Sequence, residues 1–164
     1  MLTVLARPGN ASSPHRAGEE AARRIAKARS EVAALVGAAP GEILFTSGAT
    51  EANNLALIGG ARALRGQGSE RTRVLVSAIE HKAVLEPAHA LTREGFEVVT
   101  APVDPFGRLD LEAYRKLLDE GVLLASVMAV NNETGVIQPI REAAAAAQTA
   151  GGAPEDLIEE ALPA

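Results

Sequence analysis

The 164-residue sequence contains no cysteine and no tryptophan, and it has only three phenylalanines and one tyrosine. The absence of cysteine excludes a disulfide scaffold, a thiolate metal site and a cysteine nucleophile among these residues. With so few aromatic rings the core must be aliphatic, and little remains for stacking on nucleic-acid bases. A cysteine-free chain of this kind predicts a cytoplasmic location.

Basic residues and long apolar runs are also scarce. Sixteen Lys and Arg stand against 21 Asp and Glu, which gives a net charge of −5, whereas a nucleic-acid-binding surface needs excess basic residues. No run approaches the roughly 20 apolar residues of a membrane-spanning helix, and the three histidines lack metal-ligand spacing. We therefore expect no nucleic-acid partner, no membrane contact and no metal site.

Apolar periodicity predicts helices and strands in alternation. Helices are predicted over residues 17–36, 49–64, 81–94, 110–120 and 139–150, and strands over residues 42–47, 73–78, 96–103 and 122–130. This alternation is typical of an α/β protein, a three-layer α/β/α sandwich with a mainly parallel sheet. We predict one domain over residues 1–150 and a short tail over residues 151–164.

The first helix and the C-terminal tail give more specific predictions. Ser13-Pro14 is predicted to cap the first helix and Gly37 to end it. One face of that helix is predicted to be buried: Ala21, Ile25, Ala28, Val32, Leu35 and Val36. The tail is predicted to be a poor strand because of Pro154 and its acidic residues, which would leave an edge of the 122–130 strand exposed.

Ligands of open α/β sheets bind at the carboxyl ends of strands, so the residues that follow each predicted strand are informative. After the 42–47 strand, Gly48, Ala49 and Thr50 begin a helix. Its free N–H groups and the Thr50 hydroxyl are suited to a phosphate. A simple helix cap explains the same residues equally well.

Two more polar segments follow strands. His81 follows the 73–78 strand and could stack on a ring, transfer a proton or cap a helix, and a structural role is the commoner one for a lone histidine. Asn131 and Asn132 follow the apolar 122–130 strand and could hydrogen-bond a ligand, or form a turn closed by Gly135. Together the three segments predict one crevice.

The residues also carry a family resemblance. GNASSPHRAG, EILFTSGATEANNLAL, EHKAVLEP, GFEVV and VNNETGVIQPI occur here in that order, and the set resembles the cysteine desulfurases of the class V aminotransferase group. These enzymes depend on pyridoxal 5′-phosphate (PLP). The resemblance covers residues 8–150 and implies the large domain of an aspartate-aminotransferase-like PLP transferase, with only its N-terminal part represented and both ends cut short.

The resemblance implies roles for individual residues. Ala49 and Thr50 would bind the cofactor phosphate, and His81 would stack on the pyridine ring as the catalytic histidine. Asn132 would contact the ring hydroxyl region and the substrate carboxylate, while residues 10–15 would lie near the substrate mouth. In such enzymes sulfur is removed from L-cysteine, giving L-alanine and an enzyme persulfide for iron–sulfur cluster assembly, and the enzyme is a homodimer.

Several parts of the family pattern are absent from these 164 residues: the cofactor-binding lysine, the aspartate that pairs with the pyridine nitrogen and the persulfide cysteine. The three lysines present, Lys27, Lys82 and Lys116, are not expected to replace the missing one, and Lys82 is expected to point away from the ring. We therefore predict no turnover by this chain alone. The alternatives are a non-catalytic remnant that binds PLP non-covalently or pairs with a full-length relative, and an unrelated phosphate-binding α/β domain, which the lack of a G-x-G-x-x-G turn disfavours. Related substrates, selenocysteine or cysteine sulfinate, stay open.

Overall fold

The computed structural model describes residues 9–150 and 157–159. They form two compact units that divide after Phe45, and each unit is described by itself.

The first unit is built on one helix, α2 (Arg16–Val36). The prediction that Ser13 caps this helix is wrong, because His15 is the N-cap residue and its Nδ1 accepts a hydrogen bond from the Gly18 backbone N–H at 3.2 Å. Gly18 itself must lack a side chain, since a Cβ there would lie 2.2 Å from the Ser13 carbonyl oxygen. The predicted end is confirmed, because Gly37 adopts φ 72° and donates its N–H to the Ala33 carbonyl.

Two other predictions for the first unit are wrong. Residues 42–47 are not a strand, since Pro40–Glu42 form the 3₁₀ helix η1 and no described strand pairs with the residues that follow. A strand needs a neighbour for its backbone groups, and here the Ile43 carbonyl instead accepts from Arg29 Nε at 2.9 Å. The apolar face of α2 is not buried either. Its exposed members are Ile25, Val32, Leu35 and Val36.

The second unit contains a four-stranded sheet in the order β2-β1-β3-β4. The strands are β1 (Arg73–Ser77), β2 (Glu97–Ala101), β3 (Val122–Val127) and β4 (Leu157–Glu159). All three pairings are parallel, so the carboxyl ends of the strands meet at one edge. β1 and β3 lie in the middle and are more completely buried than β2, as expected of a parallel sheet covered on both faces.

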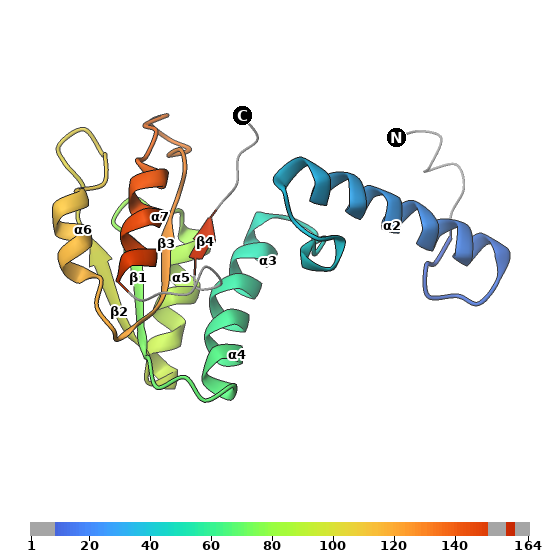
Figure 1. Ribbon diagram of the computed structural model, residues 1–164, viewed down its shortest axis with the longest axis horizontal. Coiled ribbons are helices and arrows are strands. Elements are labelled where there is room, and N and C mark those ends of the chain that lie inside the picture. The colour runs from blue at the N-terminus through green and yellow to red at the C-terminus, as the bar shows by residue number, and fades with distance from the viewer. Residues whose placement is uncertain (1–8, 151–156, 160–164) are drawn as a thin grey trace. The chain divides into compact units, whose positions relative to one another are not determined.

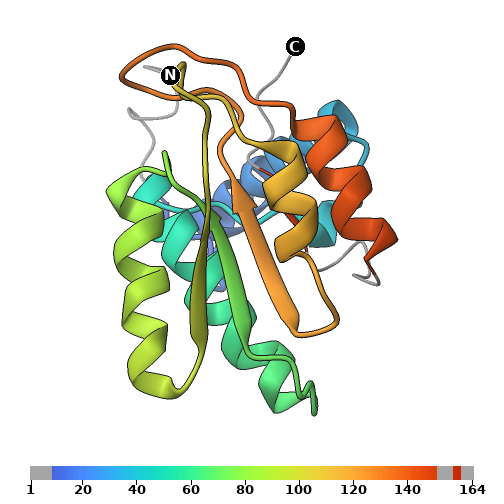
Figure 2. The same ribbon diagram turned by 90° about the vertical axis from the view of Figure 1, so that its left-hand side faces the viewer.

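Helices cover both faces of this sheet (Figure 1). Figure 2 shows the green helices on one side of the sheet and the gold and orange helices on the other. The first layer holds α3 (Ala49–Asn54), the π-helix η2 (Leu55–Gly59), α4 (Gly60–Gly66), α5 (Lys82–Leu91) and the 3₁₀ helix η3 (Thr92–Glu94). The second holds α6 (Leu111–Leu117) and α7 (Ile140–Thr149). The predicted three-layer sandwich is therefore confirmed.

Alternation along β1 divides the core between the two layers. Val74 and Val76 pack with Leu57 and Leu91 on the α3–α5 side, whereas Leu75 packs with Tyr114 on the α6–α7 side. Successive side chains of a strand point to opposite faces. The result is two mainly aliphatic core clusters separated by the sheet.

The prediction that the tail is a poor strand is wrong. Leu157–Glu159 pairs in parallel with Ala125–Val127 and covers that part of the β3 edge. An unpaired strand edge offers a ready template for a short segment. Pro154 precedes the paired residues in the sequence, so its missing N–H removes no hydrogen bond of this ladder.

Acid is expected to weaken the second unit through a carboxylate on its surface. Arg62 donates two hydrogen bonds to Glu94, from Nη2 at 2.6 Å and from Nε at 3.0 Å, and this contact lowers the pKa of Glu94 below its ordinary 4.5. The pKa of Glu94 is therefore lower in the folded state than in the unfolded state. Such a group stabilises the fold at pH values above its unfolded-state pKa, and this stability is lost as the pH falls through its folded-state pKa.

The test compares urea unfolding at neutral pH and at pH about 3.5. Arg62→Ala is expected to reduce the pH dependence of the unfolding midpoint, while Arg93→Ala, at a nearby exposed position, leaves it unchanged. An unaltered pH dependence in Arg62→Ala would contradict the assignment of this pKa shift.

Candidate active site

The polar segments predicted to share a crevice lie at the carboxyl edge of the sheet or at a helix start. Residues 78–81 follow β1, residues 128–138 follow β3, and residues 46–51 lead into α3. Sheet register brings the ends of β1 and β3 together, because Val76 pairs with Ser126.

The start of α3 is connected to the preceding residue Ser47 by the side chain of Glu51. Its Oε2 accepts hydrogen bonds from the Ser47 backbone N–H at 2.7 Å and from Ser47 Oγ at 2.5 Å, and these bonds lower the pKa of the carboxyl. The N-cap residue, Gly48, has no side chain to cap the helix. The first N–H groups of a helix lack acceptors within it, so those beside Ala49 and Thr50 are available to an oxygen ligand. Both residues are exposed.

His81 is the N-cap residue of α5. Its Nδ1 accepts a hydrogen bond from the Ala83 backbone N–H at 3.0 Å, so the ring is oriented by the helix it caps. This bond leaves Nε2 and the ring face for other contacts. The structural and functional interpretations of His81 are therefore compatible, because one nitrogen caps the helix while the ring stays exposed.

Thr50 and His81 line one groove of about 480 Å³ between the α3–η2 segment and α5. Its lining combines four apolar residues with five polar or charged ones. The lining residues are Thr50, Asn54, Ile58, His81, Lys82, Ala83, Glu86, Pro87 and Ala90. Lys82 thus shares the groove with His81; its predicted orientation away from a stacked ring stays a prediction.

The loop after β3 is folded around Asn131. Asn131 Oδ1 accepts hydrogen bonds from the backbone N–H groups of Glu133 and Thr134, at 3.0 and 2.9 Å. Gly135 closes the turn with φ 73°, which a side chain would strain. Asn132 lies inside this turn and is exposed, but it is not among the residues that line the groove of Thr50 and His81.

Two residues next to the predicted site make contacts that the sequence did not reveal: Glu80 was assigned no role, and Asn131 was expected only to bind a ligand or to form the turn closed by Gly135. Glu80 is only 7% exposed, and its Oε1 accepts hydrogen bonds from Ser77 Oγ at 2.9 Å and from the Met128 backbone N–H at 2.6 Å. Asn131 Nδ2 donates to the Ile79 carbonyl at 3.1 Å. The only sequence signal for either was its place beside His81 or Asn132, because their partners are 48 and 52 residues away.

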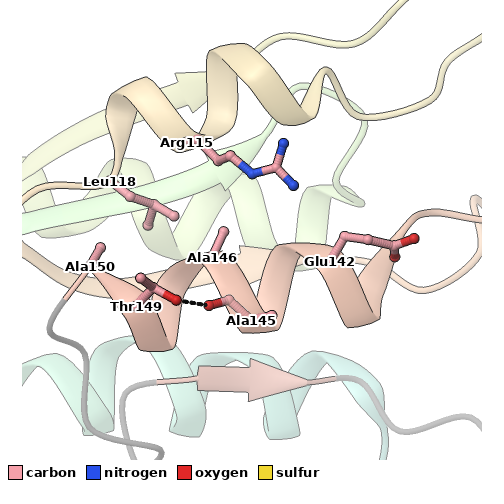
Figure 3. A pocket seen from close by; sticks show the side chains of 7 residues that line it. All are labelled: Arg115, Leu118, Glu142, Ala145, Ala146, Thr149 and Ala150. Atoms are coloured by element: carbon pink, nitrogen blue, oxygen red, sulfur yellow. Dashed lines mark hydrogen bonds between the residues drawn. The ribbon is translucent and has the colours of Figure 1, made fainter.

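A second hollow lies in the other helical layer. A groove of about 500 Å³ between α6 and α7 has alanines and Leu118 along it, with Arg115 on one side and Glu142 at one end (Figure 3). Thr149 Oγ1 does not face a ligand there, because it donates to the Ala145 carbonyl of its own helix at 2.7 Å. This groove contains none of the predicted site residues.

Metal-ligand clusters and membrane-spanning helices are both absent from the part of the chain that the structure describes. No group of three His, Asp or Glu side chains there could hold a metal ion. None of the helices described is both long and apolar enough to cross a bilayer.

Sequence comparison identifies relatives that share most of this chain. The chain is 48% identical over 134 residues to cysteine desulfurase IscS 1 of Archaeoglobus fulgidus, covering 82% of this chain and 34% of that protein. It is 46% identical over 144 residues to cysteine desulfurase IscS of an Anaeromyxobacter species, covering 87% and 35%. The chain therefore spans about a third of the length of the curated relatives it matches.

Solved structures agree with the sequence relatives. A NifS-like protein matches with a TM-score of 0.87 and 36% identity over 99% of this chain and 44% of its own, and DndA from Streptomyces lividans with a TM-score of 0.78 and 46% identity over 93% and 41%. The family model for class-V aminotransferases matches residues 5–153. The chain therefore belongs to the class-V aminotransferases, a family of PLP-dependent enzymes.

Proposed function

We propose that this chain forms the N-terminal part of the large domain of a PLP-dependent cysteine desulfurase. Residues 1–150 supply the domain and residues 151–164 a divergent tail. The observation that carries the proposal is the 48% identity to a cysteine desulfurase over 134 residues. The whole enzyme would remove sulfur from L-cysteine, giving L-alanine and a persulfide, as a cytoplasmic homodimer that supplies iron–sulfur cluster assembly.

The first groove and the exposed residues Ala49 and Asn132 outside its lining offer groups that suit the cofactor. The groove's volume of about 480 Å³ falls within the roughly 300–1,000 Å³ of small-molecule sites. Thr50 offers a hydroxyl and, with Ala49, backbone N–H groups that have no acceptor within the helix, which suits a phosphate. His81 offers a ring face, since its Nδ1 is already bonded to the helix. Asn132 offers an exposed amide for a ring hydroxyl or a substrate carboxylate.

Bound PLP supplies an electron sink for the negative charge that develops on the substrate. The chain's own residues bind and orient. Thr50 and Ala49 would hold the phosphate end, and His81 would meet the ring. His81 would hold the ring by stacking and, through Nε2, could move a proton. Asn132 would orient the substrate carboxylate by donating its amide N–H.

A second candidate is non-catalytic: a remnant that binds PLP without a covalent link, or that pairs with a full-length relative through the family's dimer surface. The sequence favours it for the chain acting alone. It contains no cysteine to carry sulfur and only three lysines, of which Lys27 is 78% exposed at its side chain and paired with Glu31.

Titration with PLP, followed by the change in cofactor absorbance, tests the proposed site. Thr50→Ala is expected to weaken binding roughly 10- to 100-fold, because a hydrogen bond to a charged group contributes about 1.5–3 kcal/mol. His81→Asn keeps an N-cap side chain but removes the ring. It is expected to weaken binding about 2- to 12-fold, from the roughly 0.5–1.5 kcal/mol of ring stacking.

Asn132→Ala should weaken binding as well. Matched controls are Thr149→Ala and His89→Ala, which change the same residue types at exposed positions outside the proposed cofactor contacts. Equal PLP affinities for all variants and controls would contradict the roles assigned to these residues. Failure of the unmutated chain to bind PLP would contradict the proposed site as a whole.

A further inference from the structure

A buried carboxylate fastens the segment after β1 to the end of β3. Glu80 directly precedes His81, is 7% exposed, and its Oε1 accepts hydrogen bonds from Ser77 Oγ and from the Met128 backbone N–H. β3 ends at Val127, so Met128 lies beyond the strand ladder. A buried backbone N–H needs an acceptor, and Glu80 provides it across 48 residues of sequence.

Asn131 makes the second connection between the same two segments. Its Nδ2 donates to the Ile79 carbonyl at 3.1 Å, and its Oδ1 accepts from the Glu133 and Thr134 N–H groups. The first bond ties the loop to the residue two positions before His81. The other two fix the turn that contains Asn132. One side chain therefore sets both the place and the shape of the loop.

The two connections differ from ordinary core packing. The apolar clusters lie on either face of the sheet, whereas these bonds join only the two segments beyond its edge. A hydrogen bond to a side-chain oxygen is directional, and a directional bond fixes orientation more strictly than apolar contact does. Both segments would still be connected to their strands without these bonds, but they would lose the side-chain hydrogen bonds that join one segment to the other.

We infer that Glu80 and Asn131 are positioning residues, which hold His81 and Asn132 in a fixed mutual position by joining the segments after β1 and β3. Neither acts on the cofactor directly. The importance of this positioning for catalysis rests on the proposed function. The positioning itself does not, because it can be measured in the chain without PLP.

The experiment uses the whole chain with and without PLP, in the variants Glu80→Ala, Glu80→Gln and Asn131→Ala. Without PLP, amide exchange of Met128 and the NMR signals of the histidine rings are recorded, with His15 and His89 as internal references. With PLP, the dissociation constant is measured. Glu120→Ala removes an exposed glutamate as the matched control.

Glu80→Ala is expected to speed Met128 exchange at least about tenfold, to shift or broaden the His81 signals alone, and to weaken PLP binding about fivefold. Glu80→Gln retains an acceptor oxygen and is expected to stay within about twofold of the unmutated chain. Asn131→Ala should move the His81 signals and weaken PLP binding, and it tests the inference even if Glu80→Ala does not fold.

Unchanged His81 signals in folded Glu80→Ala and Asn131→Ala would overturn the inference, and so would equal losses in Glu80→Gln and Glu80→Ala. If the unmutated chain binds no PLP, the proposed function fails. The exchange and histidine measurements then still decide whether the two side chains position the loops.

Discussion

Borohydride reduction of the chain mixed with one equivalent of PLP is expected to leave no pyridoxyl group on any lysine, and addition of L-cysteine is expected to release no alanine. Covalent PLP chemistry needs an amine held at the cofactor and activated by its surroundings. The sequence offers Lys27, Lys82 and Lys116. All three lie on helices, and Lys82 is exposed although it lines the groove with His81.

Mass spectrometry after reduction checks the first expectation, and an alanine assay checks the second. A full-length cysteine desulfurase serves as the positive control for both. Lys82→Ala is expected to bind PLP as the unmutated chain does, because the proposed contacts come from Thr50, His81 and Asn132. A stoichiometric adduct that disappears in Lys82→Ala would show instead that Lys82 takes the missing lysine's place.

Leu75→Ala is expected to lower the free energy of unfolding by about 2–5 kcal/mol, from lost apolar burial plus the cavity left behind. Leu75 is fully buried at the centre of β1, which lies between β2 and β3 and is one of the two strands that end at the candidate site. Domains have a net stability of roughly 5–15 kcal/mol. This one substitution therefore removes a large fraction of it.

Urea unfolding of Leu75→Ala against Leu55→Ala provides the measurement. Leu55 is 46% exposed, so the same change there is expected to alter stability by no more than about 0.5 kcal/mol. Equal effects at both positions would contradict the assignment of Leu75 to a close-packed core. The comparison matters in this chain because few aromatic side chains contribute buried area to the core, so aliphatic residues must supply most of it. Tyr114 is the single tyrosine in the core.

Much of the fold could be predicted because local pattern carries it. The apolar run at 122–130 indicated a strand covered on both faces, and a fully buried strand is found over Val122–Val127; Gly37 indicated a helix end, which is confirmed. Predictions failed where the outcome depended on a distant neighbour. The 42–47 run has strand composition but no described strand beside it, and the face of α2 that includes Ile25 and Leu35 has the periodicity of a buried face yet is exposed.

The candidate site divides in the same way. The motifs marked Thr50, His81 and Asn132, and the structure places Thr50 and His81 on one groove while Asn132 lies in the neighbouring loop. Glu80 stood in a quoted motif without a role, because nothing in its local sequence reveals that its partner is the Met128 N–H.

The amino-acid sequence by itself determined the order of helices and strands over residues 49–150, the aliphatic character of the core and the family, since these depend on composition, spacing and motif identity within short segments. The tertiary structure alone decided which polar groups meet. Parallel pairing of β1 with β3 brings residues about 50 positions apart to the same edge. The hydrogen bonds of Glu80 and Asn131 exist only because neighbouring strands lie about 4.8 Å apart.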